Sequence, residues 1–205
     1  MRLSNLAFLA RSVASGGGGG GGTITVSRNT GADLALGELA TYRNGGGTNA
    51  GYWEPGVGSS RMLWRPGAGF NTTSIPGVIT GALLRLHMIE QFGASTVTAY
   101  NNLRNWSTSW NSPSWANWAE DTPWATAGGS GAADRSAAAI GTQAAPGANG
   151  VWVEIALNAA AVEAWRQAGG VGACGVQLVG SDQYSTFITD IGSDGLRPEL
   201  VLTYS

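Results

Sequence analysis

The side chains that could perform acid–base or nucleophilic chemistry are few and widely spaced in this chain. His87 is the only histidine and Cys174 the only cysteine in 205 residues, so neither a His–His nor a Cys–His metal set can form within the chain. A Ser–His–acid triad would require His87, yet no serine occupies the Gly-x-Ser-x-Gly setting of a nucleophile elbow. Strand alternation also places His87 beside Arg85 on a solvent-facing side. The sequence therefore predicts a protein that is not an enzyme.

The carboxylates that could bind a ligand fall into two groups along the sequence. Asp182, Asp190 and Asp194 lie around one predicted hairpin, and their oxygens would suit Ca²⁺. Glu120 and Asp121 are adjacent in a tryptophan-rich segment, and a pair of acids can also serve a glycosidase. Turn residues in ordinary ion pairs explain the same spacing. Ca²⁺ is thus the one cofactor that we consider, and otherwise none is expected.

A tryptophan-rich segment is the most distinctive feature of the sequence. It holds five of the nine tryptophans, among Ser, Thr, Asn and Pro residues without helical or strand periodicity: Trp106, Trp110, Trp115, Trp118 and Trp124. Each indole buries a large area and carries one N–H that needs a partner. In one interpretation the rings pack an insertion onto a sheet. In the other, Trp115, Trp118 and Trp124 lie flat at the surface and stack on sugar rings, with Glu120 and Asp121 accepting hydroxyl hydrogen bonds.

The composition narrows the class of protein. All eleven basic residues are arginine, the net charge is −2, and no basic cluster is present, which argues against a nucleic-acid partner. Apolar residues make up 43% of the chain, too many for wholesale disorder. No apolar run approaches the roughly 18 residues of a membrane span. A single cysteine favours assembly inside the cell.

The N-terminal residues 1–15 form a short amphipathic unit followed by a glycine run. The apolar residues fall mostly at helical spacing and would contact a partner: Leu3, Leu6, Phe8, Leu9 and Val13. A helix of this length is marginal alone in water, so another protein must cover its apolar face. A signal peptide is the alternative, but the apolar stretch is short and interrupted. Residues 16–22 are seven glycines and predict a flexible tether.

Residues 23–205 are predicted to form one β-rich head. Alternating apolar segments between Gly, Pro and Asn clusters predict strands at 23–27, 61–65, 82–90, 96–100, 151–155, 175–179, 185–190 and 199–204. One short helix is expected at Ala159–Gln167, with Asn158 as its N-cap and with Val162 and Trp165 facing inward. Residues 125–149 are expected to form a long loop. The predicted fold is all-β, a two-sheet antiparallel β-sandwich of jelly-roll type.

Several short motifs recur in an order known from one family. They are Arg61–Arg65, Ser74-Ile75-Pro76, Gly81–Leu86, Val97–Tyr100, Pro123–Gly129 with Asp134, Trp165 before Gly169, and Arg197–Tyr204. In this order they resemble the DNRLRE domain, a β-sandwich family grouped with carbohydrate-binding modules. The resemblance covers about residues 30–205 and leaves residues 1–22 outside. It implies a jelly-roll-like fold and an accessory, non-catalytic role in larger assemblies or secreted polysaccharide-acting proteins.

Two functions are compatible with these features. The first is a structural protein of a tailed-phage virion, in which residues 1–15 dock into a capsid, collar or tail lattice and the head decorates the particle. Such a protein is assembled in the host cytoplasm, and homo-oligomers are expected. The alternative is a secreted carbohydrate-binding module that stacks sugars on exposed tryptophans. A cell-surface glycan is a partner that both hypotheses allow, whereas nucleic acid and membrane are not expected.

Overall fold

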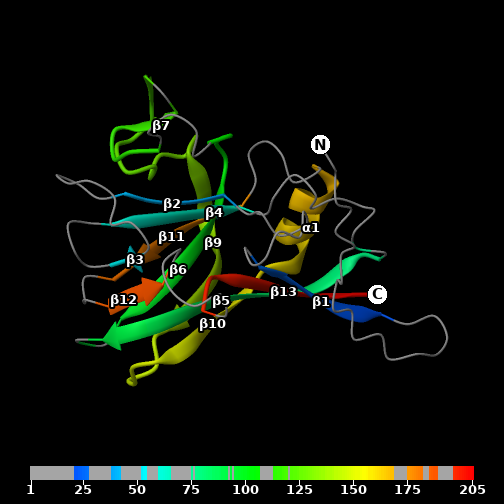
Figure 1. Ribbon diagram of the computed structural model, residues 1–205. Coiled ribbons are helices and arrows are strands. Elements are labelled where there is room, and N and C mark those ends of the chain that lie inside the picture. Colours follow the sequence, from blue (N-terminus) through cyan, green and yellow to red (C-terminus); the bar gives the residue numbers. More distant parts are fainter. Residues whose placement is uncertain are drawn as a thin grey trace, which may run out of the picture.

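The computed structural model describes most of the head and none of residues 1–20. The described residues are 21–27, 38–42, 52–54, 60–65, 75, 77–91, 93, 95–106, 113–119, 121–168, 175–181, 185–188 and 196–205. Within them the chain forms two antiparallel sheets that face each other, with one short helix beside them (Figure 1). The prediction of an all-β sandwich is confirmed.

The first sheet is organised around its longest strand, β5 (Ile79–Gln91). Strand β10 (Val151–Leu157) pairs with one side of β5. On the other side, β13 (Glu199–Tyr204) and β12 (Ser185–Ile188) pair with successive parts of β5. The sheet is completed by β1 (Gly22–Ser27), which pairs with β13, and by β3 (Tyr52–Trp53), which pairs with β12.

The second sheet contains five described strands, which lie in the order β2, β4, β11, β6 and β9. Their bounds are Glu38–Tyr42 for β2, Arg61–Arg65 for β4, Val176–Gly180 for β11, Thr96–Asn102 for β6 and Arg135–Ala144 for β9. Consecutive strands often belong to different sheets, so the chain crosses the core repeatedly. A separate hairpin is formed by β7 (Asn117–Ala119) and β8 (Thr122–Pro123).

The core lies between the sheets because alternate residues of each strand point to the same side. In β5 the inward row is Leu84, Leu86 and Met88, each 0% exposed, as alternation predicts. Opposite side chains come from the second sheet, including Met62, Trp64, Val176 and Leu178. Each such side chain contributes about 1.5–3 kcal/mol by leaving water.

Helix α1 (Ala159–Gln167) links the two sheets at one end of the core, within the predicted bounds. The Asn158 side chain accepts a hydrogen bond from Ala161 N at 3.1 Å, which caps the first turn. Trp165 is buried, and its Nε1 donates to Asn101 Oδ1 of the second sheet at 2.7 Å. Glu163 accepts from Ile79 N of the first sheet at 3.1 Å. The helix is therefore fixed to both sheets by buried polar contacts.

The prediction of one long loop over residues 125–149 was wrong, because β9 occupies ten of them. Its small side chains are required where β9 passes β10. A Cβ on Gly141 would lie 2.5 Å from the carbonyl oxygen of Ala156. The backbone of Asn158 also donates to Ile140 O at 2.7 Å. Tertiary crowding, rather than the turn propensity of Gly, Ala and Ser, decides the structure here.

The tether and the head meet one residue earlier than expected. Gly22, the last residue of the glycine run, is the first residue of β1 and is the register partner of Tyr204. A Cβ at Gly22 would lie 2.4 Å from the Tyr204 hydroxyl, so this glycine fills a packing role. Residues 1–20, including the predicted docking peptide, lie outside the described residues.

Candidate functional site

The tryptophan-rich segment forms a third layer on the outer face of the second sheet. We define this tryptophan-rich layer as the described parts of residues 103–134. Leu63 of β4 points away from the core, yet it is 0% exposed because Trp106 and Trp124 pack over it. Trp115 and Trp118 pack against the same cluster and are partly buried. The packing interpretation of the segment therefore describes most of these rings. Figure 1 shows the β7 hairpin of the layer on the side of β2 and β4.

Trp124 is a packing residue rather than a surface for sugar stacking. Its side chain is 5% exposed, and its Nε1 donates to the carbonyl oxygen of Ser114 at 2.8 Å. Its backbone N–H donates to Ala116 O at 3.0 Å. The expectation of an exposed Trp124 was wrong because the indole needs both an apolar surface and a partner for its N–H, and the layer supplies both.

Trp115 is held by neighbours from two parts of the chain. The guanidinium carbon of Arg61 lies 5.3 Å from its ring centroid. Gly128, at φ 79°, packs so closely that a Cβ there would lie 2.6 Å from Trp115 Cη2. Gly128 N also donates to Trp115 O at 2.7 Å. These contacts occupy the ring that the sugar-binding hypothesis requires.

Among the predicted glycan-site residues, Asp121 is exposed, and Trp118, like Trp115, is partly exposed. Trp118 is a partly exposed residue of β7, and Arg104 lies 5.6 Å from its ring centroid. Asp121 is exposed in the turn between β7 and β8, with φ 51°. Glu120 lies outside the described residues. The hairpin thus presents one indole and one carboxylate together.

Asp134 is the polar centre of the layer. Its Oδ1 accepts from Ala125 N at 3.0 Å and from Arg104 Nε at 2.9 Å. Its Oδ2 accepts from Thr126 N at 3.0 Å and from Gly131 N at 3.2 Å. Burial alone would raise the pKa of this carboxyl, but the backbone donors and Arg104 outweigh it and lower the pKa. The Pro123–Gly129 motif predicted an acid at this position from the sequence. Only the structure shows that this acid holds the 125–131 loop closed.

Arginine side chains connect the layer to the sheet. Arg65 lies 5.1 Å from the Trp106 ring centroid, and its Nη1 donates to Asn105 Oδ1 at 2.9 Å. Within the sheet, the guanidinium carbon of Arg135 lies 3.8 Å from the Tyr100 ring centroid, and Arg135 donates to Gln177 Oε1 at 3.2 Å. Gln177 Nε2 in turn donates to Gly128 O of the layer at 3.1 Å. The planar guanidinium can stack and donate at once, which lysine cannot match. The arginine-only composition is the signal that could have predicted these contacts.

A second polar cluster lies on the outer face of the first sheet. Arg85 donates to Glu154 at 3.0 Å and to Glu199 at 2.7 Å, and it lies 4.6 Å from the Trp152 ring centroid. His87 meets the same indole edge-on, with ring centroids 5.2 Å apart, and is 8% exposed. The prediction of a solvent-facing His87 was wrong. Its strand position is on the outer face, but the large neighbouring indole helps to cover it.

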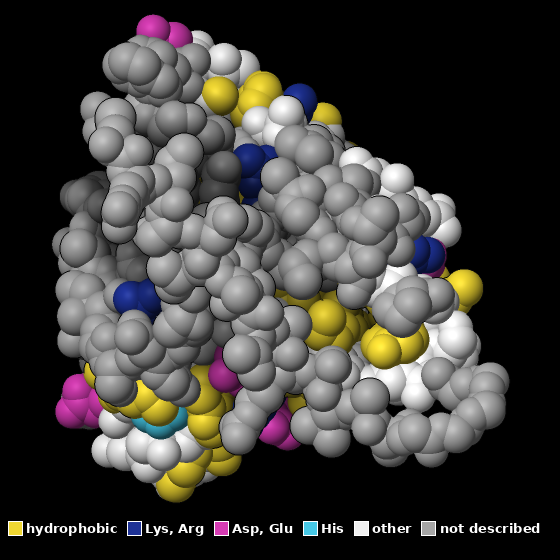
Figure 2. Space-filling model, turned by 45° about the vertical axis from the view of Figure 1, so that its right-hand side comes forward, with side chains coloured by type: hydrophobic (Ala, Val, Ile, Leu, Met, Phe, Trp, Pro, Cys, Tyr) yellow, Lys and Arg dark blue, Asp and Glu magenta, His cyan; other side chains and the backbone are white. Residues whose placement is uncertain are grey.

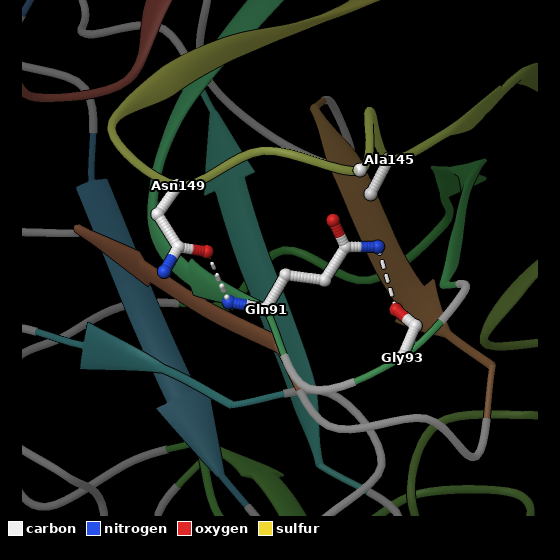
Figure 3. Close-up of a pocket in the computed structure, with 5 residues that line it drawn as sticks. Gln91, Gly93, Ala145 and Asn149 are labelled. Carbon is white, nitrogen blue, oxygen red and sulfur yellow. Dashed lines mark hydrogen bonds between the residues drawn. The ribbon is translucent and has the colours of Figure 1, made fainter.

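A small neutral cleft lies between the β5–β6 and β9–β10 connections (Figure 3). It has a volume of about 370 Å³ and is lined by Gln91, Gly93, Ala145, Gly147 and Asn149. Asn149 Oδ1 accepts from Gln91 N at 3.0 Å, and Gln91 Nε2 donates to Gly93 O at 2.5 Å. The first contact joins the two connections, and the second lies within the β5–β6 connection.

The remaining predicted site residues lie outside the described residues. These are the docking residues Leu3, Leu6, Phe8, Leu9 and Val13, the acids Asp182, Asp190 and Asp194, and Cys174. In the part of the chain that is described, no three His, Cys, Asp or Glu side chains converge as a metal site. On the face seen in Figure 2, the described arginines appear as separate spots without a basic patch.

The helix in the described part of the chain is too short and too polar to cross a membrane. No model of a known protein family matches the chain. No curated protein matches it either.

Proposed function

We propose that the chain is a non-enzymatic structural protein of a tailed-phage virion, located in its capsid, collar or tail. Its N-terminal peptide would dock into the particle, and the DNRLRE-like sandwich would be displayed outside. The observation that carries the proposal is the way the tether enters the head. The glycine run continues into β1 without a connecting loop, and β1 pairs with the closing strand β13 over six residues.

This arrangement suits a displayed head. A flexible tether lets the head move relative to a docked peptide. Where the tether meets the head, the whole β1–β13 ladder anchors it, because backbone pairing fixes every residue from Gly22 to Ser27. A force applied through the tether is therefore distributed along a strand.

The polar side chains of the head favour the same proposal, since many of them act in packing. Asp134 closes the tryptophan-rich layer, and Glu163 joins α1 to β5. Arg85 holds two carboxylates on adjoining strands. These groups are occupied in stabilising contacts, as a structural role requires.

If the N-terminal peptide docks through its apolar face, replacing its apolar residues with charged ones should strongly reduce incorporation of the chain into particles. The full chain is expected to co-sediment with virus-sized particles from its native source, starting at Met1 or Arg2 by mass spectrometry. Leu6→Asp with Leu9→Asp should reduce the particle-bound fraction at least tenfold, because charges would enter the apolar contact. Ser4→Asp, on the opposite helical face, is the matched control. A soluble chain cleaved near Ser15, or a double variant that incorporates normally, would refute the proposal.

The second candidate, weak glycan binding, is favoured by the partial exposure of Trp118 beside Asp121. If the hairpin binds a cell-surface polysaccharide, Trp118→Ala should weaken binding about five- to tenfold, since stacking on one indole contributes about 1 kcal/mol. Trp152→Ala, on the opposite sheet, is the control. Isothermal titration with the purified polysaccharide measures both. Equal affinities of the two variants would eliminate the hairpin as a sugar site.

A further inference from the structure

Strand β1 is an edge strand without the usual protection against pairing. It pairs with β13 on one side, and no strand or turn pairs with its other side among the residues that the structure describes. Its sequence, Gly-Thr-Ile-Thr-Val-Ser, contains no charge and no proline. Its register with β13 runs through six consecutive pairs without a bulge. Charges, prolines and bulges are the features that normally block edge pairing.

The other edge strands differ from β1. At the far edge of the same sheet, β3 is only two residues long. Strand β9 has two register shifts against β6 and passes closely over β10. Strand β10 is covered by β9 on the side away from β5, as the Asn158–Ile140 hydrogen bond indicates. Strand β2 begins with Glu38, a charged residue. Bulges, coverage and charge therefore accompany these edges and are absent from β1.

The side to which each backbone group of β1 points can be worked out from the last residues of β13. Val78 and Ser205 donate to each other, with N–O distances of 3.1 and 3.0 Å, so the backbone of Ser205 faces β5. In an antiparallel strand, the backbone N–H and C=O groups of successive residues point alternately to the two neighbouring strands. Those of Tyr204 therefore point toward β1. Its register partner is Gly22.

Counting from Gly22, alternate residues of β1 direct their N–H and C=O groups toward β13. The residues between them, Thr23 and Thr25, direct theirs toward the open edge. Both threonine side chains are exposed. Among the described residues, the edge thus presents a row of backbone donors and acceptors without partners, flanked by small polar side chains, which is the template that another strand needs.

We propose that β1 pairs antiparallel with β1 of a second copy of this chain, joining two heads through one continuous sheet. A two-fold axis at Thr25 places this residue opposite its own copy and places Thr23 opposite residue 27. This register uses every outward-facing backbone group of the strand. A two-fold axis is also the commonest symmetry of homo-oligomers.

A second copy fits this edge better than an unrelated peptide because β1 is complementary to itself. In this register, threonine lies opposite threonine on the polar face. On the other face, the half-buried Ile24 lies opposite Val26, so apolar residues meet apolar residues. No charges oppose each other within the paired strands.

The interface would be small, so the dimer should be weak in dilute solution. Pairing of two six-residue strands buries less than the roughly 1,200 Å² of a standard stable interface. On a particle, however, the pair would present two N-terminal peptides together, and their docking would be reinforced by avidity. The inference goes beyond the proposed function and can fail without it, because its test needs no particle.

Proline substitution at the open edge tests the interface in the full chain. Thr25→Pro removes an N–H that faces away from β13, so the head should fold normally while edge pairing is blocked. Thr25→Val keeps the N–H and is the matched control. Sedimentation velocity over a concentration series should show a monomer–dimer equilibrium for the wild type and Thr25→Val, with at least tenfold weaker association for Thr25→Pro. A monomeric wild type, or association unchanged by proline, overturns the proposal.

A cross-linking measurement gives an independent answer if the proline variant folds poorly. Thr25→Cys in a Cys174→Ser background should form a covalent dimer on mild oxidation, because Thr25 would lie within disulfide reach of its own copy. Val78→Cys in the same background is the control. Val78 is 55% exposed but lies two strands away from β1, so the spacing between strands alone would separate its copies by about 24 Å. Cross-linking of Val78→Cys equal to that of Thr25→Cys overturns the register.

Discussion

Replacing Asp134 with asparagine is expected to destabilise the head by about 3–5 kcal/mol, the cost of breaking a buried charge network. Each oxygen of this carboxylate accepts two hydrogen bonds, one pair from Ala125 N and Arg104 Nε and the other from Thr126 N and Gly131 N. An asparagine amide has only one oxygen. In either orientation its NH₂ group therefore faces two donors, and Arg104 loses its counter-charge.

The stability lost in Asp134→Asn should be lost mainly from the tryptophan-rich layer. Asp134 connects the 125–131 loop to Arg104, which in turn lies over Trp118. In the Asp134→Asn variant, we expect the near-UV circular dichroism of the indoles to weaken at a lower urea concentration than the far-UV signal of the sheets. The stability that the Asp134 carboxylate contributes to the wild type is complete above the ordinary pKa of an aspartate. It is lost as pH falls through the lowered pKa of Asp134.

Asp121→Asn is the matched control for Asp134→Asn. Asp121 is an exposed carboxylate in the same layer, and its positive φ is a conformation that asparagine also tolerates. We expect a change within about 0.5 kcal/mol. Equal urea midpoints for the two asparagine variants would show that the Asp134 network does not hold the layer in place.

Local patterns predicted the elements in which one physical effect dominates. The Asn158 cap and the inward spacing of Val162 and Trp165 predicted α1 to the residue. Strict alternation in β5 predicted its buried row correctly. In both segments, propensity and burial favour the same structure, so the sequence alone is sufficient.

Local patterns could not predict the elements whose structure depends on residues distant in the sequence. Strand β9 exists because β6 pairs with it and β10 crowds it, which a Gly- and Ala-rich segment does not reveal. His87 has the strand position of an outer-face residue, yet Trp152, 65 positions later in the chain, packs against its ring. The candidate site shows the same limit. The tryptophans were recognisable, but which of them would be buried depended on Leu63 and on the loop closed by Asp134.

The second large effect is expected at Glu163, whose replacement by glutamine should cost about 3 kcal/mol at neutral pH. Hydrogen bonds from Arg166, opposed by burial and aided by Ile79 N and Gln167, lower the pKa of this carboxyl from 4.5 to about 2. Its side chain is 11% exposed, so solvent screens the interaction only weakly. The same pairing raises the pKa of Arg166.

The sign of the pH dependence follows from this lowered pKa. Because the folded carboxyl titrates below the unfolded one, its contribution is complete above about pH 4.5 and disappears as pH falls toward 2. The wild type should therefore lose its advantage over Glu163→Gln across that window. Urea denaturation of both proteins at several pH values between 7 and 2 measures the difference directly.

Glu154→Gln separates this effect from acid destabilisation in general. The Glu154 carboxylate is 50% exposed in its pair with Arg85, so its replacement should cost less than about 1 kcal/mol. If the Glu163→Gln difference closes at low pH while the Glu154→Gln difference stays small, the buried carboxylate joins α1 to β5 through its charge. If Glu163→Gln remains equally destabilised down to pH 2, shape and packing hold the helix there, because a protonated glutamate would then still outperform glutamine.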